Sequence, residues 1–192
     1  MKPCISIVTV CRNEGARIRR TAESVAGQTC RDFEWIVIDG GSTDGTIEIL
    51  REFREQMAVF ISEPDGGIYD AMNKGIRFAQ GEYCLFMNGG DEFYDPQAIE
   101  KFNSIEKKAD YNYGGTLEVY GDRRVQKYAS PVTRVHEYLY EGSLPHQASF
   151  IRRELFEKYG GYDVSFPILA DREFCLRAIL RRSGAGADGP GG

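Results

Sequence analysis

The chain has 192 residues, of which 42% are hydrophobic and 28% are charged, and this composition is typical of one packed globular domain rather than a disordered or collagen-like chain. The formal net charge of -5 argues against a protein whose main task is to hold a nucleic-acid backbone, because such proteins need a clustered basic surface. No apolar stretch approaches the about 18 residues of a membrane-spanning helix, and the N-terminus lacks the pattern of a signal peptide. The five cysteines are scattered without metal-site spacing, so we expect reduced thiols and a cytoplasmic protein.

The first half of the chain alternates short β-branched runs with helical patterns. The runs predicted as buried strands are Ile5–Cys11, Phe33–Ile38, Ala58–Ile61 and Tyr83–Met87. Apolar residues recur at helical spacing in the three segments between them, within 18–25, 47–54 and 68–79. This order predicts an α/β fold with a mostly parallel central sheet and helices on both faces. Ligands in such folds bind beyond the carboxyl ends of the strands.

The second half has a different pattern. Its predicted elements are a helix over Gln97–Ile105, a strand over Tyr111–Tyr120 with a turn at 121–123, an apolar run at Ala148–Ile151, and helices over Glu154–Tyr159 and Arg172–Arg181. The last segment, 182–192, is rich in glycine and alanine, so we expect a disordered low-complexity tail there.

Polar loops rich in glycine, asparagine and aspartate follow the predicted strands of the first half. They lie at 12–14, 39–45, 63–67 and 88–91. Because parallel strands end at one edge of a sheet, these loops predict a ligand site. The sequence contains no dinucleotide-binding G-x-G-x-x-G after the first strand, no P-loop and no G-x-S-x-G elbow, which argues against dehydrogenases, P-loop enzymes and serine hydrolases.

Three carboxylates are candidates for ligand chemistry, and each has a structural alternative. Asp39 ends a strand where an acidic side chain can bind a ribose or base, whereas Ser42 and Asp44 are better explained as caps of the next helix. Asp91 can anchor Mg²⁺ or Mn²⁺, or it can be a turn residue. Asp171 is either an N-cap or, because it shares a helical face with apolar residues, a general base whose pKa is raised by partial burial.

Four segments in this order resemble the family 2 glycosyltransferases of the GT-A fold. They are Val8–Glu14, Val37–Thr46, Gly81–Phe86 and Gly160–Asp163. The stretch 64–75 is similar to that of some bacterial members that build capsular, exopolysaccharide or lipopolysaccharide chains. The resemblance implies a Rossmann-like GT-A domain over 1–181, with a nucleotide-sugar-binding half at about 1–95 and an acceptor and catalytic-base half at about 96–181.

This resemblance implies an inverting, metal-dependent glycosyltransferase of bacterial surface polysaccharide synthesis. The implied donor is a nucleoside-diphosphate sugar, with a UDP-sugar expected, and the implied acceptor is a saccharide or a lipid-linked saccharide. The implied cofactor is Mn²⁺ or Mg²⁺. Such an enzyme is compatible with peripheral association at the inner face of the cell membrane, although no sequence segment encodes it.

By position in the family motifs, the resemblance implies that Asp171 is the catalytic base and that Asp91, the last carboxylate of the D-x-D motif, is the metal ligand. The residues implied around the donor are Thr9, Arg12, Asn13, Glu14, Asp39, Asp65, Asn73, Lys74, Asn88 and Gly89. His146 and Gln147 are expected in the acceptor wall, with a plain loop position as the alternative for His146. Because 88–90 lacks the usual acids and the chain is short after the base helix, the alternative function is a weak or inactive nucleotide-sugar-binding module.

Overall fold

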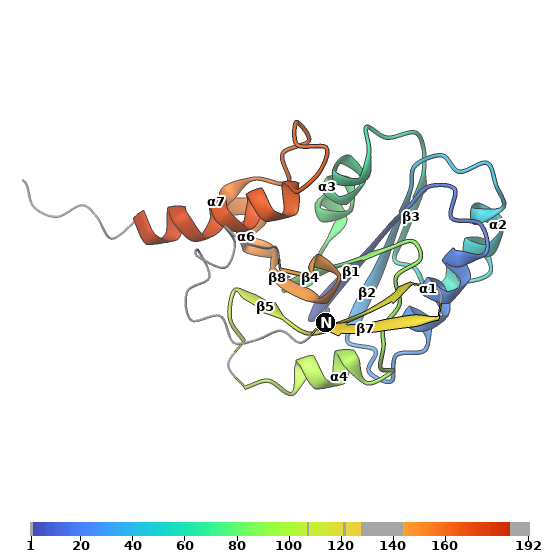
Figure 1. Cartoon of the computed structure of the whole chain (residues 1–192), viewed down its shortest axis with the longest axis horizontal. Coiled ribbons are helices and arrows are strands. Elements are labelled where there is room, and N and C mark those ends of the chain that lie inside the picture. The colour runs from blue at the N-terminus through green and yellow to red at the C-terminus, as the bar shows by residue number, and fades with distance from the viewer. Residues whose placement is uncertain (1, 107, 121, 128–143, 185–192) are drawn as a thin grey trace, which may run out of the picture.

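The computed structural model describes residues 2–106, 108–120, 122–127 and 144–184. At its centre lies a six-stranded sheet in the order β3-β2-β1-β4-β8-β5 (Figure 1). The four parallel strands are β3 (Val59–Ser62), β2 (Phe33–Asp39), β1 (Ile5–Cys11) and β4 (Tyr83–Asn88). β8 (Ser149–Arg152) runs antiparallel to both of its neighbours, β4 and β5 (Tyr111–Tyr113). The expected α/β fold with a mostly parallel sheet is therefore confirmed.

Helices pack on both faces of this sheet (Figure 1). Those on one face are α1 (Arg17–Ala26), α2 (Thr46–Arg51) and α4 (Ala98–Asn103). Those on the other face are α3 (Ile68–Phe78), α6 (Arg153–Tyr159) and α7 (Ala170–Gly184). Two short 3-10 helices, η1 (Arg54–Gln56) and η2 (His146–Ala148), complete the helical elements that the described residues form.

β1 contributes to both cores because its side chains alternate between the two faces. Ile5 and Ile7 pack with α1 and α4, whereas Val8 and Val10 pack with α3. All seven residues of the strand are buried. Burial on both faces explains why this strand is a continuous run of small and β-branched residues rather than an alternating one.

The packing of α3 on β1 depends on a glycine. A Cβ atom at Gly75 would lie 2.3 Å from Cγ1 of Val8, whose β-branched side chain has little rotamer freedom. We expect Gly75→Ala to lower the free energy of unfolding by about 1–3 kcal/mol through overpacking, even though alanine is the better helix former. Denaturant titration measures this loss. Gly114→Ala is the control, since its nearest contact would be an ordinary 3.8 Å, and equal losses in the two variants would contradict the packing argument.

The predicted strand over Tyr111–Tyr120 is wrong, because the structure has two strands there. β5 ends at Tyr113, and the N–H of Gly114 then donates to the Ala148 carbonyl at 2.8 Å. The next strand, β6 (Thr116–Tyr120), is not part of the main sheet. It pairs antiparallel with β7 (Arg123–Lys127), a strand that the sequence pattern did not predict, in a separate two-stranded sheet.

The last helix is longer at both ends than predicted. α7 begins at Ala170, so Asp171 lies in its first turn, and it ends at Gly184 rather than at Arg181. The prediction of a tail from residue 182 is therefore wrong for 182–184, and 185–192 lie outside the described residues. None of the helices in the described part of the chain has the length and hydropathy needed to cross a bilayer.

Candidate functional site

The polar loops that follow the parallel strands meet at one edge of the sheet. The N–H of Gly40 donates to the Cys11 carbonyl at 2.9 Å, and the N–H of Gly89 donates to the Val10 carbonyl at 2.8 Å. These bonds join the loops after β2 and β4 to the end of β1. Asn13 adds a third link, since its side-chain oxygen accepts from the N–H of Thr43 at 2.9 Å.

Asp39 organises the loop after β2. Its side chain is fully buried, and Oδ2 accepts from the N–H groups of Gly41 at 3.1 Å and Ser42 at 2.9 Å and from the hydroxyl of Ser62 at 2.7 Å. Oδ1 accepts from the hydroxyl of Ser42. The predicted capping role of Ser42 is wrong, because this hydroxyl binds Asp39 instead. In this structure the Asp39 carboxylate has no surface exposed to a base, so its first role is to shape the edge.

Small residues let charged side chains approach this edge closely. A Cβ atom at Gly40 would lie 2.5 Å from Oδ2 of Asp65 and 3.3 Å from Cδ of Arg12, and one at Gly89 would lie 2.5 Å from Cγ of Glu14. Burial raises the pKa of Glu14, and the ion pair with Arg17 at 2.9 Å offsets only part of that effect. Arg12, Glu14 and Asp65 therefore lie where the sequence placed them, around the ends of β1 and β2.

Three other residues predicted around the donor are engaged in structural contacts. Thr9 is fully buried inside the sheet, and its hydroxyl accepts from the Trp35 indole at 2.9 Å, so the prediction that it lines the nucleotide pocket is wrong. The amide of Asn73 makes two hydrogen bonds of 2.8 Å with the backbone of Tyr162 and acts as a bridge between α3 and the loop after α6. Nζ of Lys74 lies 3.0 Å from Oε1 of Glu63, so the charge of Lys74 is paired with a carboxylate of this chain.

Asp91 lies in the turn after β4, where its N–H donates to the Asn88 carbonyl at 3.0 Å. Burial raises the pKa of Asp91, while the proximity of His146 and a hydrogen bond with the Gln147 side chain act in the opposite direction. The side-chain oxygen of the neighbouring Asn88 is buried and has no hydrogen-bond partner among the residues that the structure describes. This turn therefore holds a carboxylate and an unsatisfied acceptor side by side.

Asp171 lies in the first turn of α7, and its carboxylate is held from two sides. Oδ1 accepts from the Tyr69 hydroxyl at 2.9 Å, and Oδ2 lies 3.3 Å from Nδ1 of His146. Burial alone would raise the pKa of Asp171, but the hydrogen bonds and the charge interaction with His146 outweigh it, so the pKa is lowered. The expectation of a raised pKa was therefore wrong, because the sequence pattern revealed the burial and not the donors. No local signal identified Tyr69, which lies on α3.

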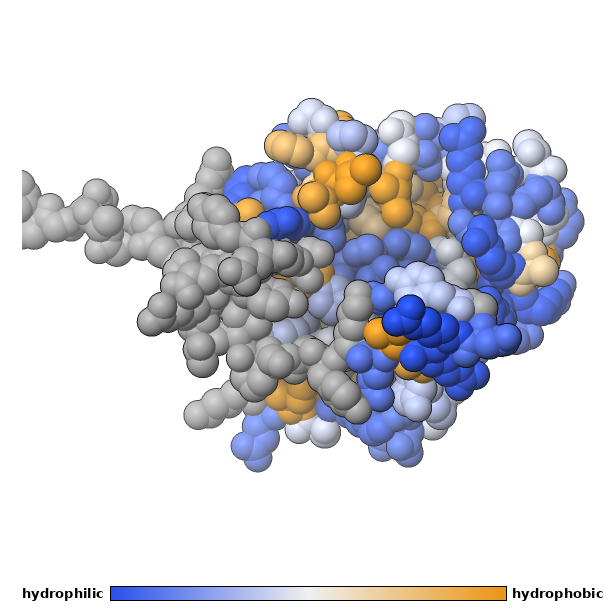
Figure 2. Space-filling view, in the orientation of Figure 1, coloured by the Kyte–Doolittle hydropathy of each residue, from blue (hydrophilic) through white to orange (hydrophobic). Residues whose placement is uncertain are grey.

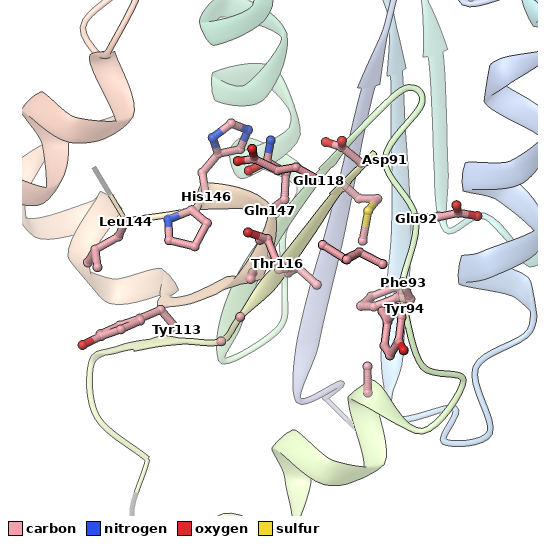
Figure 3. A pocket seen from close by; sticks show the side chains of 18 of the residues that line it. Asp91, Glu92, Phe93, Tyr94, Tyr113, Thr116, Glu118, Leu144, His146 and Gln147 are labelled. Carbon is pink, nitrogen blue, oxygen red and sulfur yellow. The ribbon is translucent and has the colours of Figure 1, made fainter. Parts of the chain in front are cut away.

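Asp91 and Asp171 line the same cavity, which has a volume of about 1380 Å³. Figure 3 shows Asp91, His146 and Gln147 gathered at one end of it, and Tyr94 and Tyr113 nearer the other. His146 and Gln147 are consecutive residues of η2, yet His146 contacts Asp171 and Gln147 contacts Asp91. Both residues line the cavity, and their polar atoms are directed at the two carboxylates.

An exposed apolar loop, which we define as residues 164–169, precedes α7 and adjoins this cavity. Its exposed large side chains are Val164, Phe166, Ile168 and Leu169. Figure 2 shows the apolar surface near the start of α7, and Ile168 and Leu169 also line the cavity. The two carboxylates therefore lie in a depression with an apolar margin.

Comparisons with known proteins agree with this architecture. The family model "Glycosyl transferase family 2" matches residues 6–183. An uncharacterised glycosyltransferase of Mycobacterium tuberculosis is 38% identical over 186 residues, which cover 93% of this chain and 70% of the relative. A PGL/p-HBAD biosynthesis glycosyltransferase of Mycobacterium bovis is 32% identical over 183 residues, which cover 92% of this chain and 70% of the relative.

Solved structures share the fold. The crystal structure of S. aureus TarS 1-349 in complex with UDP has a TM-score of 0.74 at 21% identity, covering 94% of this chain and 55% of that one. The mannosyltransferase PcManGT of Pyrobaculum calidifontis, in complex with GDP-Man and Mn²⁺, has a TM-score of 0.61 at 19% identity. The match covers 85% of this chain and 48% of the mannosyltransferase. This chain thus spans about half the length of those two. The match of the family model to nearly all of the chain, together with the sheet edge and its loops, shows that the protein belongs to glycosyltransferase family 2 and is a glycosyltransferase with the GT-A fold.

Proposed function

We propose that the protein is an inverting, metal-dependent glycosyltransferase that transfers a sugar from a UDP-sugar to an acceptor hydroxyl. The observation that carries this proposal is the placement of Asp91 and Asp171 in one cavity at the ligand-binding edge of the sheet. The TarS structures in complex with UDP and with UDP-GlcNAc support a nucleotide-sugar donor with a uracil base. A saccharide acceptor of a bacterial surface glycoconjugate is supported by the names of two relatives, a PGL/p-HBAD biosynthesis glycosyltransferase and a putative teichuronic acid biosynthesis glycosyltransferase.

Asp171 would act as the general base. Its lowered pKa keeps the carboxylate charged at neutral pH, ready to accept a proton. As the acceptor oxygen attacks the anomeric carbon, its proton passes to Asp171 and the bond from that carbon to the diphosphate oxygen breaks. The products are the glycosylated acceptor and the nucleoside diphosphate. A single in-line displacement of this kind inverts the anomeric configuration, and an oriented base on the acceptor side accelerates it.

The residues around Asp91 fit a divalent cation that the substrate helps to hold. In the described residues, no group of three or more His, Cys, Asp or Glu side chains is arranged to hold a metal ion alone. Mg²⁺ and Mn²⁺ do not require such a group, because one or two carboxylates with substrate phosphates and water complete their shell. Asp91 offers one such carboxylate, steadied by Gln147. The bound ion would supply stabilisation of the charge that develops on the diphosphate leaving group.

The proposal is tested by incubating the protein with UDP-, GDP- and dTDP-sugars, with and without MnCl₂, and measuring release of the nucleoside diphosphate. We expect Mn²⁺-dependent release from a UDP-sugar, and a product of opposite anomeric configuration by NMR when a saccharide acceptor is added. Tight donor binding without turnover would contradict the proposal and favour a nucleotide-sugar-binding module. Product with retained configuration would contradict the inverting mechanism.

We expect Asp91→Ala to reduce the Mn²⁺-dependent part of UDP binding about tenfold, a loss of about 1.4 kcal/mol. The reason is that the variant removes the carboxylate of this turn that bonds to the Gln147 side chain in the cavity (Figure 3). Isothermal titration of UDP with and without MnCl₂ measures the difference. Glu92→Ala is the matched control, because this neighbouring carboxylate is exposed and points away from Asp91 in Figure 3. Equal Mn²⁺ dependence in both variants would remove Asp91 from the metal site.

A further inference from the structure

A chain of side-chain contacts connects the end of β4 to the start of α7. Nδ2 of Asn88 lies 2.9 Å from Nε2 of His146, and Nδ1 of the same ring lies 3.3 Å from Oδ2 of Asp171. Tyr69 completes the chain from α3, with its hydroxyl 2.9 Å from Oδ1 of Asp171. The chain of contacts thus joins residues of β4, η2, α7 and α3, which are distant in sequence.

The contact with Asn88 determines which tautomer of His146 faces Asp171. With the amide nitrogen of Asn88 facing the ring, Nε2 of His146 is the acceptor in this contact, because an amide nitrogen donates hydrogen bonds. A neutral imidazole that accepts at Nε2 carries its hydrogen on Nδ1. That hydrogen points at Oδ2 of Asp171, which accepts it. The side chain of Asn88, three residues before Asp91, therefore determines that Nδ1 of His146 is the atom that donates to Asp171.

We propose that Tyr69 and His146 are positioning residues that hold the Asp171 carboxylate in its reactive orientation, and that Asn88 fixes the tautomer of His146. This inference rests on the proposed function of Asp171 as the base. Two fixed donors leave each carboxylate oxygen with a second lone pair, so the base can still accept a proton. The side chains of Asp171 and His146 are 14% and 22% exposed, so an acceptor in the cavity can reach this carboxylate.

The tyrosines and the cysteine around Asp171 stay neutral at ordinary pH. Burial, with a smaller contribution from the charge of Asp171, raises the pKa of Tyr69 to about 12 and that of Cys175 on α7 to about 12. Burial also raises the pKa of Tyr111 on β5 and of Tyr162 in the loop after α6. These tyrosines and this cysteine therefore add no charge beside the base.

The positioning role is tested with Tyr69→Phe, His146→Gln and His146→Asn. We expect Tyr69→Phe and His146→Gln each to lower kcat/KM about tenfold, because a loosely held base is displaced from its productive geometry. Each donor that is removed had favoured the charged carboxylate, so the pKa of Asp171 should rise and the acid limb of the pH–rate profile should move to higher pH. His146→Asn places an amide N–H near the position of Nδ1 and is expected to recover most of the activity and of the profile.

A merely structural role would lower activity in all three variants without moving the acid limb, and that result would overturn the proposal. Equal losses in His146→Asn and His146→Gln would overturn it as well. The affinity for UDP should stay unchanged in Tyr69→Phe, since the Tyr69 hydroxyl bonds to Asp171 and not to the loops that follow β1, β2 and β4.

A readout without turnover separates this inference from the proposed function. The chain has two histidines, so ring ¹⁵N chemical shifts assigned with a His136→Gln variant report the tautomer of His146. We expect the Nδ1–H tautomer in the wild type and a mixture of tautomers in Asn88→Ala. If that shift is seen while no donor supports transfer, the contacts hold and the proposed function fails. If the tautomer is the same in both proteins, the role of Asn88 fails whatever the activity.

Discussion

Replacing Asp171 by asparagine is expected to lower kcat about 10²–10⁴-fold, the usual contribution of a positioned general base. Asparagine has nearly the same shape and can still accept a hydrogen bond, but its amide cannot take the proton of an acceptor hydroxyl. The loss should therefore fall on the chemical step. Release of the nucleoside diphosphate at saturating donor and acceptor measures kcat, and calorimetry with UDP and MnCl₂ should give an unchanged Kd.

The matched control is Glu173→Gln, which removes a carboxylate from the same turn of α7. Glu173 forms an ion pair with Arg177 at 2.8 Å and does not line the cavity, so kcat should change little. If Asp171→Asn transfers sugar at the rate of the wild type, another group removes the proton. If its Kd for UDP rises as much as its kcat falls, Asp171 contributes to donor binding instead.

The first half of the fold could be predicted because its strands are buried on both faces. β1 lies between β2 and β4 and has helices on both faces, so it is buried throughout. Such a strand can be recognised from local sequence alone, because it is a continuous apolar run. The loops after such strands must then share an edge, so the position of Asp39 and Asp91 at that edge could be predicted. The same logic explains the error at Thr9, because a polar residue inside a fully buried strand pairs within the core and not with a ligand.

The second half could not be predicted as well, because its strands are short and only half-buried. β5 has three residues, and its end depends on the contact between Gly114 and Ala148 across the chain. The one local sign of the break is the Gly114-Gly115 pair, because glycine is depleted in strands and a glycine pair is typical of turns. That sign shows where a strand ends but not that the next strand belongs to another sheet, so the β6–β7 hairpin became visible only in the structure.

The carboxylates of the site could be predicted from the sequence, but the residues that bind them could not. Asp171 was identified from a family motif and a helical face, but Tyr69 is 102 residues away in sequence and belongs to a helix whose pattern indicates only packing. The direction of the pKa shift depends on such partners, because burial and hydrogen bonds act in opposite senses on a carboxylate. The sequence pattern indicates the burial of Asp171 but does not show which side chains donate hydrogen bonds to it.

The second large effect is expected at Asp39. Asp39→Ala should lower the free energy of unfolding by about 3–5 kcal/mol and the melting temperature by about 10 °C, as expected for breaking a buried charged network in a chain of this size. The variant removes the fully buried carboxylate that accepts from the N–H groups of Gly41 and Ser42 and from the hydroxyl of Ser62. Thermal and urea unfolding measure the loss.

Two further variants distinguish the network from a general effect of charge. Glu48→Ala removes an exposed carboxylate from α2 and should change stability by about 0.5 kcal/mol or less. Asp39→Asn keeps one acceptor oxygen but places an amide NH₂ against groups that themselves donate, so its stability should fall between that of Asp39→Ala and the wild type. Because the same bonds shape the loop after β2, UDP affinity should fall in the order wild type, Asp39→Asn, Asp39→Ala. If stability falls in that order while UDP affinity stays constant, Asp39 supports the fold and the donor does not depend on this loop.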